Sequence, residues 1–106
     1  MINIEFKPKT WELNVKGHAQ HGEEGKDIVC AAVSALFYTL GESLNQSQDI
    51  QLESPVIKDE NGDGYIKCTP DPEYELNVSY IFGTVLTGMQ MAAVRYPEYV
   101  SLIISE

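Results

Sequence analysis

The chain has 106 residues, a hydrophobic content of 43% and a formal net charge of −9. This length suits one domain over residues 1–106, with a single modest core and no separate regulatory module. Only seven Lys and Arg residues are present, which argues against a nucleic-acid partner, because phosphate binding needs clustered cations. The acidity either favours a basic protein or peptide as the partner, or serves only to keep the chain soluble.

The N-terminal residues 1–6 lack a basic leader followed by an unbroken apolar segment, and no apolar run reaches the roughly 20 residues that span a bilayer. We therefore expect a cytoplasmic protein without a membrane partner. The two cysteines, Cys30 and Cys68, are too few for a disulfide framework and form no CxxC pair. Both are expected to be reduced thiols, and we expect neither a metal nor a cofactor.

Alternation of apolar and polar residues predicts a β-hairpin at the start of the chain. Its two strands are separated by a break at residues 7–9, and their apolar positions are Ile2, Ile4, Phe6, Trp11, Leu13 and Val15. Residues 17–26 then contain three glycines and no apolar periodicity. This segment is expected to be a surface loop that connects the second strand to a helix.

The first helix is predicted to begin with Asp27 as its N-cap and to end between Gly41 and Ser47. Cys30 would then be the third residue of the helix. Positions that recur at helical spacing are expected to face the core, namely Val29, Val33, Leu36, Phe37, Leu40 and Leu44. Spacings of three and four residues place Cys30 and Ser34 on one side of this helix.

The remaining segments predict a second hairpin, a second helix and a last strand. The hairpin is expected to join residues 50–54 to residues 65–68, and the helix to open at residues 71–73 and to end at Pro97. Residues 100–104 alternate as a final strand. The resulting order, ββαββαβ, predicts an α+β fold in which two helices pack on one mixed or antiparallel sheet as two layers.

Residues 59–64 match the opening of a calcium loop, with oxygen ligands at the first, third and fifth positions and Gly64 at the sixth. The twelfth position should be a bidentate glutamate, but it is Pro70. We therefore favour a hairpin turn over a metal site for this segment.

His18 and Cys30 are the candidate catalytic residues, because the strand that ends before His18 and the helix that carries Cys30 flank the same loop. A single cysteine is more often an inert core residue. At a helix N-terminus and beside an imidazole, however, its thiolate becomes accessible as a nucleophile. His21 is the competing base, but it lies beside Gly22 in the glycine-rich loop, where tight geometry is harder to hold.

Two further residues have alternative interpretations. Asp27 is a helix cap, an acid that orients the histidine, or both. Ser34, one turn after Cys30, either donates a hydrogen bond to the site or bonds the helix backbone. Backbone N–H groups of the first helical turn would be available to stabilise an oxyanion.

The segment Gly17-His18-Ala19, followed by GKDIVCAAVSAL at residues 25–36, resembles the bacterial ribosomal-processing cysteine protease family, most densely over residues 17–40. The resemblance implies a homodimeric α/β cysteine endopeptidase with His18 and Cys30 as its catalytic dyad. It also implies that Asp27 and Ser34 belong to the site. Its implied substrate is the twenty-seventh protein of the bacterial large ribosomal subunit, from which an N-terminal extension is removed after an aromatic residue.

The resemblance further implies that the loop between the dyad residues moves aside to admit the peptide. The residues assigned to this substrate-gating loop are Gly17, Ala19, Gln20, His21, Gly22 and Gly25. The wide apolar stripe of the second helix, which is more than one small sheet face can cover, independently favours a dimer.

Other functions stay open at this point. The chain could act on another protein with a similar cleavage motif. It could also be a non-catalytic acidic binding protein or ribosome-assembly factor in which Cys30 only packs. A calcium-responsive module is the third alternative.

Overall fold

The computed structural model describes residues 1–17 and 24–106 of the chain. The strands and long helices are β1 (Ile2–Lys7), β2 (Glu12–Lys16), α1 (Glu24–Asn45), β3 (Val56–Glu60), β4 (Asp63–Lys67), α2 (Glu75–Arg95) and β5 (Val100–Ile104). Two short 3₁₀ helices, Gln48–Ile50 and Pro72–Tyr74, follow α1 and precede α2. The predicted ββαββαβ order is therefore confirmed.

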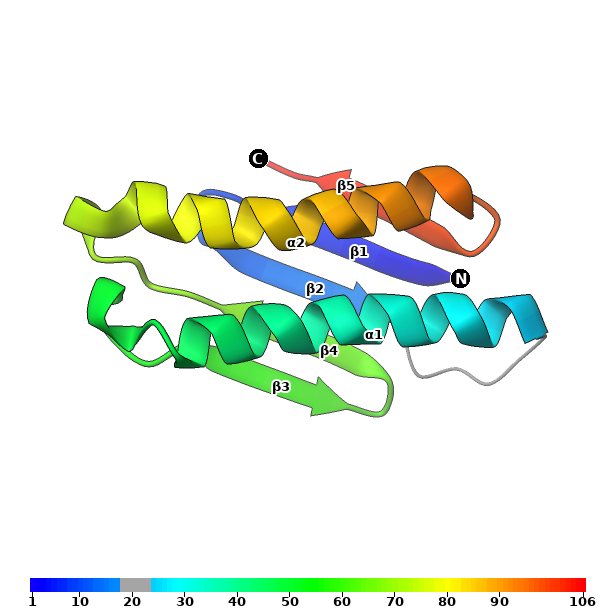
Figure 1. Cartoon of the computed structure of the whole chain (residues 1–106), viewed down its shortest axis with the longest axis horizontal. Helices are drawn as coiled ribbons and strands as arrows, with labels where there is room; N and C mark the ends of the chain where they lie inside the picture. The colour runs from blue at the N-terminus through cyan, green and yellow to red at the C-terminus, as the bar shows by residue number, and fades with distance from the viewer. Residues whose placement is uncertain (18–23) are drawn as a thin grey trace.

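The five strands form one sheet in the order β3-β4-β2-β1-β5. Neighbouring strands are antiparallel except β1 and β5, which are parallel, so the sheet is mixed. Both helices lie on the same face of the sheet and run in opposite directions (Figure 1). This arrangement confirms the predicted two-layer α+β architecture.

The core lies between the helices and the sheet. On the helices it is formed by the apolar positions that recur at helical spacing, which in α1 include Cys30. These buried positions are Val29, Cys30, Val33, Phe37, Leu40 and Leu44 in α1, and Val78, Phe82, Val85 and Met89 in α2. Leu36, predicted to face the core, is partly buried against it.

The second hairpin forms, but its first strand was placed too early in the sequence. β3 is Val56–Glu60, whereas the predicted residues 50–54 comprise the end of a 3₁₀ helix, the buried Gln51 and the exposed residues 52–54. Asn61 and Gly62 both have positive φ, 54° and 81°, as a two-residue type I′ turn requires. Such a turn pairs the residues directly before it with those directly after it, which fixes the register Glu60↔Asp63. Residues 59–64 thus form a tight hairpin and not an open calcium loop.

Helix α1 begins one turn earlier than predicted. Its first residue is Glu24, so Asp27 is the fourth helical residue and Cys30 the seventh. The predictions of Asp27 as the N-cap, of Cys30 as the third residue and of Gly25 as part of the loop are therefore wrong. Glu and Lys are good helix formers, and Glu24 and Lys26 allow the helix to extend beyond the expected cap. The predicted C-terminal boundary is confirmed by the end at Asn45.

By length and composition alone, the segment Asp27–Asn45 of α1 would suffice to cross a membrane. This corrects the expectation that no segment reaches that length, because the only charged residues in the segment are Asp27 and Glu42, and its Ala, Val and Leu residues keep the mean hydropathy high. In the fold, Val33, Phe37 and Leu40 are fully buried in the core. The segment therefore packs as the core helix of a globular domain.

Candidate active site

The N-terminal part of α1, the end of β2 and the β3–β4 turn lie at the same end of the molecule (Figure 1). This end carries the segments on both sides of the proposed catalytic loop. His18, Ala19, Gln20, His21 and Gly22 lie outside the described residues, so the pairing of His18 with Cys30 stays a prediction.

Three of the predicted site residues share one side of α1. Asp27, Cys30 and Ser34 are separated by three and four residues within the helix. Asp27 is exposed, Ser34 is half-buried, and Cys30 is only 6% exposed. A carboxylate, a thiol and a hydroxyl are thus stacked along one stripe, from the start of the helix toward its centre.

The position of Cys30 changes the expected source of its activation. The amides without a helical acceptor lie in the first turn, and the effect of the macrodipole is concentrated there. Cys30, as the seventh residue, lies one turn beyond it. The first-turn amides are therefore farther along the helix from Cys30 than its predicted third position implied, and more of the activation falls to a neighbouring base.

Cys68, the other thiol, is built into the core. It is 1% exposed, and its Sγ donates a hydrogen bond to Gln51 Oε1 over 3.4 Å. The Gln51 amide nitrogen in turn donates to the carbonyls of Leu44 and Ser47, at 2.8 and 3.0 Å. Burial raises the pKa of Cys68 to about 11, because it penalises the thiolate. This thiol is held neutral and inaccessible, so its role is structural.

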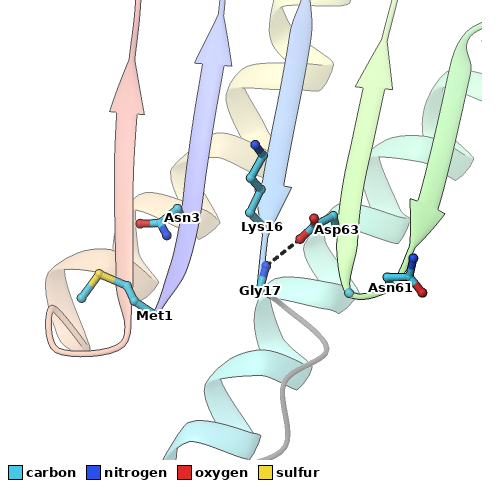
Figure 2. Close-up of a pocket in the computed structure, with 7 residues that line it drawn as sticks. Met1, Asn3, Lys16, Gly17, Asn61 and Asp63 are labelled. Atoms are coloured by element: carbon cyan, nitrogen blue, oxygen red, sulfur yellow. Dashed lines mark hydrogen bonds between the residues drawn. The ribbon is translucent and has the colours of Figure 1, made fainter.

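Gly17, the residue before His18, is fixed by the β3–β4 hairpin. Its φ of 86° is readily available only to glycine. Its N–H group donates to Gly62 O and to Asp63 Oδ1, each at 3.1 Å. Figure 2 shows the Asp63 carboxylate directed at this N–H group, whereas Lys16 extends away from it.

Gly17 and Asp63 also line a hollow of about 350 Å³, together with Asn3, Lys16 and Asn61. The sequence patterns had considered Asp63 only as a calcium ligand. Its contact with Gly17 depends on the register between β2 and β4, which no local sequence pattern indicates. Among residues 1–17 and 24–106, no cluster of three His, Cys, Asp or Glu side chains is arranged to hold a metal ion.

The comparison with protein families decides the class of this site. The profile of the family described as cysteine protease Prp matches residues 1–101. The chain belongs to the cysteine protease Prp family. It is therefore a cysteine-type peptidase, a hydrolase, and the alternative of a non-catalytic acidic binding protein is not supported.

Two bacterial relatives are named ribosomal processing cysteine protease Prp. The ribosomal processing cysteine protease Prp of Staphylococcus aureus is 29% identical over 101 residues, covering 95% of this chain and 92% of the relative. The protein of that name from Mycoplasma genitalium is 30% identical over 88 residues, covering 83% of this chain and 82% of the relative.

Solved Prp structures share the fold over nearly the whole chain. The S. aureus protease in complex with a substrate peptide superposes with a TM-score of 0.76 at 27% identity, covering 99% of this chain and 100% of the other. The same protease with a covalently linked product peptide gives a TM-score of 0.73 at 28% identity, with the same coverage.

Proposed function

We propose that this Prp-family chain is an endopeptidase whose nucleophile is Cys30. The observation that carries the proposal is the contrast between the two thiols. Cys68 is hydrogen-bonded in the core with its pKa raised to about 11, which leaves Cys30 as the thiol for the family's chemistry. Cys30 also lies on the stripe of α1 that carries Asp27 and Ser34, at the end of the molecule where the chain leaves β2.

His18 is proposed as the general base. It directly follows Gly17, whose backbone is held by two hydrogen bonds, whereas His21 is four residues from that anchor. A catalytic imidazole must be held within tight limits, since a misplacement of about 1 Å costs roughly 100-fold in rate. The anchored position therefore favours His18.

The reaction proceeds by acyl transfer. His18 accepts the proton of Cys30, and Sγ attacks the scissile carbonyl carbon to form a tetrahedral intermediate. The C–N bond then breaks as the imidazolium gives its proton to the leaving amine. Water, deprotonated by His18, attacks the resulting thioester and releases the new carboxylate together with the regenerated thiol.

Asp27 and Ser34 are proposed as supporting residues. Asp27 lies one turn before Cys30 on the same side of the helix and is exposed, which suits its carboxylate to accept the second N–H of the histidine. Ser34, one turn after Cys30 and half-buried, is suited to donate a hydrogen bond toward the thiolate or the substrate.

The proposed substrate is a basic ribosomal protein with an N-terminal extension, because the relatives are named ribosomal processing proteases and one was solved with a substrate peptide. The net charge of −9 would attract such a protein, an effect that salt would weaken. The loop residues Gly17, Ala19, Gln20, His21 and Gly22 are proposed to gate peptide entry. Since ribosomal proteins are made in the cytoplasm, we propose that the enzyme works there.

A homodimer is also proposed, formed through the outer face of α2. Leu76, Tyr80, Met91 and Val94 lie along this face and are 64 to 70% exposed. Gly83, between them, has nothing within 4 Å of its Cβ position. An apolar stripe of this length with a small residue at its centre suits close packing against a second helix.

The test is incubation of the protein with basic ribosomal proteins that carry an N-terminal extension, followed by mass analysis of released fragments. We expect one fragment with the parent, the same fragment with Cys68→Ser, and a rate at least about 1,000-fold lower with Cys30→Ser. Cys68→Ser is the matched control because it makes the same change at the structural thiol. Cleavage by Cys30→Ser at the parent rate would overturn the proposal.

A further inference from the structure

The start of β4 contacts both segments that carry the proposed catalytic residues. On one side, Asp63 and the preceding Gly62 accept hydrogen bonds from Gly17, which comes directly before His18. On the other side, the next residue, Gly64, packs against Phe37, two turns after Cys30 on α1. One short piece of backbone thus connects the two halves of the site.

The pairing of β2 with β4 ends just before Gly17, which is why the Asp63 side chain can hold the Gly17 backbone. Lys16 pairs with Asp63 as the last register pair between β2 and β4. Gly17 lies one residue beyond this pair, where the strand ends and a chain would normally become free to change direction. Here the N–H group of Gly17 donates to both Gly62 O and Asp63 Oδ1, which makes a three-centre hydrogen bond. The Asp63 carboxylate points toward this N–H group (Figure 2).

The two acceptors restrict the backbone just before the base. One peptide unit separates Gly17 from His18, and the left-handed φ of Gly17 sets the direction in which that unit leaves β2. The side-chain oxygen of Asp63 is a second acceptor for the Gly17 N–H group, so it contributes a restraint that Gly62 O alone does not give.

We infer that Asp63 is a positioning residue for the protease, acting through Gly17 on the placement of His18 relative to Cys30. The inference rests on the proposed function, because it takes His18 as the base. Asp63 is exposed and its hydrogen bond lies at the surface, so the bond contributes little to stability. The role of this hydrogen bond is to orient the backbone before His18. Removing it should therefore lower kcat far more than it lowers the free energy of unfolding.

The test compares Asp63→Ala, Asp63→Asn and Glu60→Ala for peptide cleavage. The asparagine retains an oxygen that accepts from Gly17. Glu60 is the matched control, since it is paired with Asp63 across the hairpin, is exposed, and loses the same charge on substitution. We expect Asp63→Ala to lower kcat by roughly 10- to 100-fold with KM changed less than about threefold. Asp63→Asn and Glu60→Ala should stay within about threefold of the parent.

A second readout is the alkylation rate of Cys30 at about pH 6, where a thiol reacts rapidly only when paired with an imidazolium. Asp63→Ala should slow this reaction as His18→Ala does, and Asp63→Asn should not. Asp63→Val guards against a disturbance of the strand by alanine, because valine favours strands and also lacks the accepting oxygen. It should slow the reaction as Asp63→Ala does.

Equal losses in Asp63→Ala and Glu60→Ala would overturn the inference, as would an Asp63→Asn variant as slow as Asp63→Ala. Parent-like activity in Asp63→Ala would also overturn it. Failure of the proposed function gives a different result, because Cys30→Ser would then retain cleavage whatever residue occupies position 63.

Discussion

Phe37 of α1 packs so closely on Gly64 of β4 that a methyl group at position 64 would lie 2.6 Å from Cε1 and 2.7 Å from Cζ of the ring. Such distances are not tolerated between carbon atoms, and Phe37 is fully buried, so the ring cannot turn away freely. Helix α1 can therefore approach the second hairpin this closely only because residue 64 has no side chain. Because Cys30 lies on α1, this pair also sets the depth of the proposed nucleophile.

The first prediction is that Gly64→Ala destabilises the protein by about 1–3 kcal/mol, since overpacking forces the ring or the strand to shift. The measurement is the free energy of unfolding in urea. Gly83→Ala is the control, because nothing else in the described part of the chain lies within 4 Å of its Cβ position. That variant should gain about 0.5–1 kcal/mol from helix propensity. Both variants are measured at a protein concentration low enough to keep the chain monomeric, since position 83 lies at the centre of the proposed dimer face. An equal response of the two variants would contradict the packing argument.

The local sequence patterns were sufficient for most of the fold. Alternation in residues 2–15 and 100–104 gave the first hairpin and β5, and helical spacing gave the buried faces of α1 and α2. The alternation at residues 50–54 was misleading, because this segment lies outside the five-stranded sheet. The Asn61-Gly62 pair was the better signal, since a type I′ turn specifies the strands on both sides of it.

The candidate site was predictable only in part. Cys30 was found through the motif around it, and the shared side of Asp27, Cys30 and Ser34 follows from helix geometry. The roles of Cys68 and Asp63 were not predictable in this way. They depend on contacts with Gln51 and Gly17, which are 17 and 46 residues away in the sequence. Local periodicity carries no information about such long-range partners.

The second prediction concerns alkaline pH and follows from the buried Cys68 thiol. Its folded pKa of about 11 lies above its ordinary value of 9.0, so the neutral thiol is favoured in the folded state. The resulting stability is fully present below about pH 9 and is lost as pH rises toward 11, up to about 3 kcal/mol in total. Cys68→Ala should show a correspondingly weaker fall between these values.

Urea unfolding at about pH 8 and pH 10.5 measures this difference. Tyr65, whose pKa the hydrogen bond to Glu12 raises to about 12, titrates in both proteins, so its effect cancels when parent and variant are compared. The same pH dependence in Cys68→Ala and the parent would show that the thiol is not the group responsible.

The third prediction separates the two histidines. At about pH 6, iodoacetamide should label Cys30 and leave Cys68 unmodified, because the buried Cys68 thiol is held neutral. His18→Ala should slow the labelling of Cys30 by roughly tenfold or more, whereas His21→Ala should leave it near the parent rate. The two variants make the same substitution three positions apart, and peptide mass mapping identifies the labelled cysteine. Slower labelling in His21→Ala alone would make His21 the base.

The fourth prediction tests the outer face of α2 as the dimer interface. Val94 is 70% exposed there, and a glutamate at this position would place two carboxylates near each other across a two-fold axis with little water to separate them. Val94→Glu should therefore weaken dimerisation by roughly tenfold or more, measured by sedimentation at micromolar protein.

Leu52→Glu is the matched control for Val94→Glu. It removes an apolar side chain of similar exposure, 64%, and adds the same charge, but it lies outside α2, in the segment between the 3₁₀ helix Gln48–Ile50 and β3. The control should sediment as the parent does. If the parent itself is a monomer at micromolar concentration, the dimer proposal is wrong. If Val94→Glu and Leu52→Glu both remain dimeric, the second copy docks on a surface other than α2.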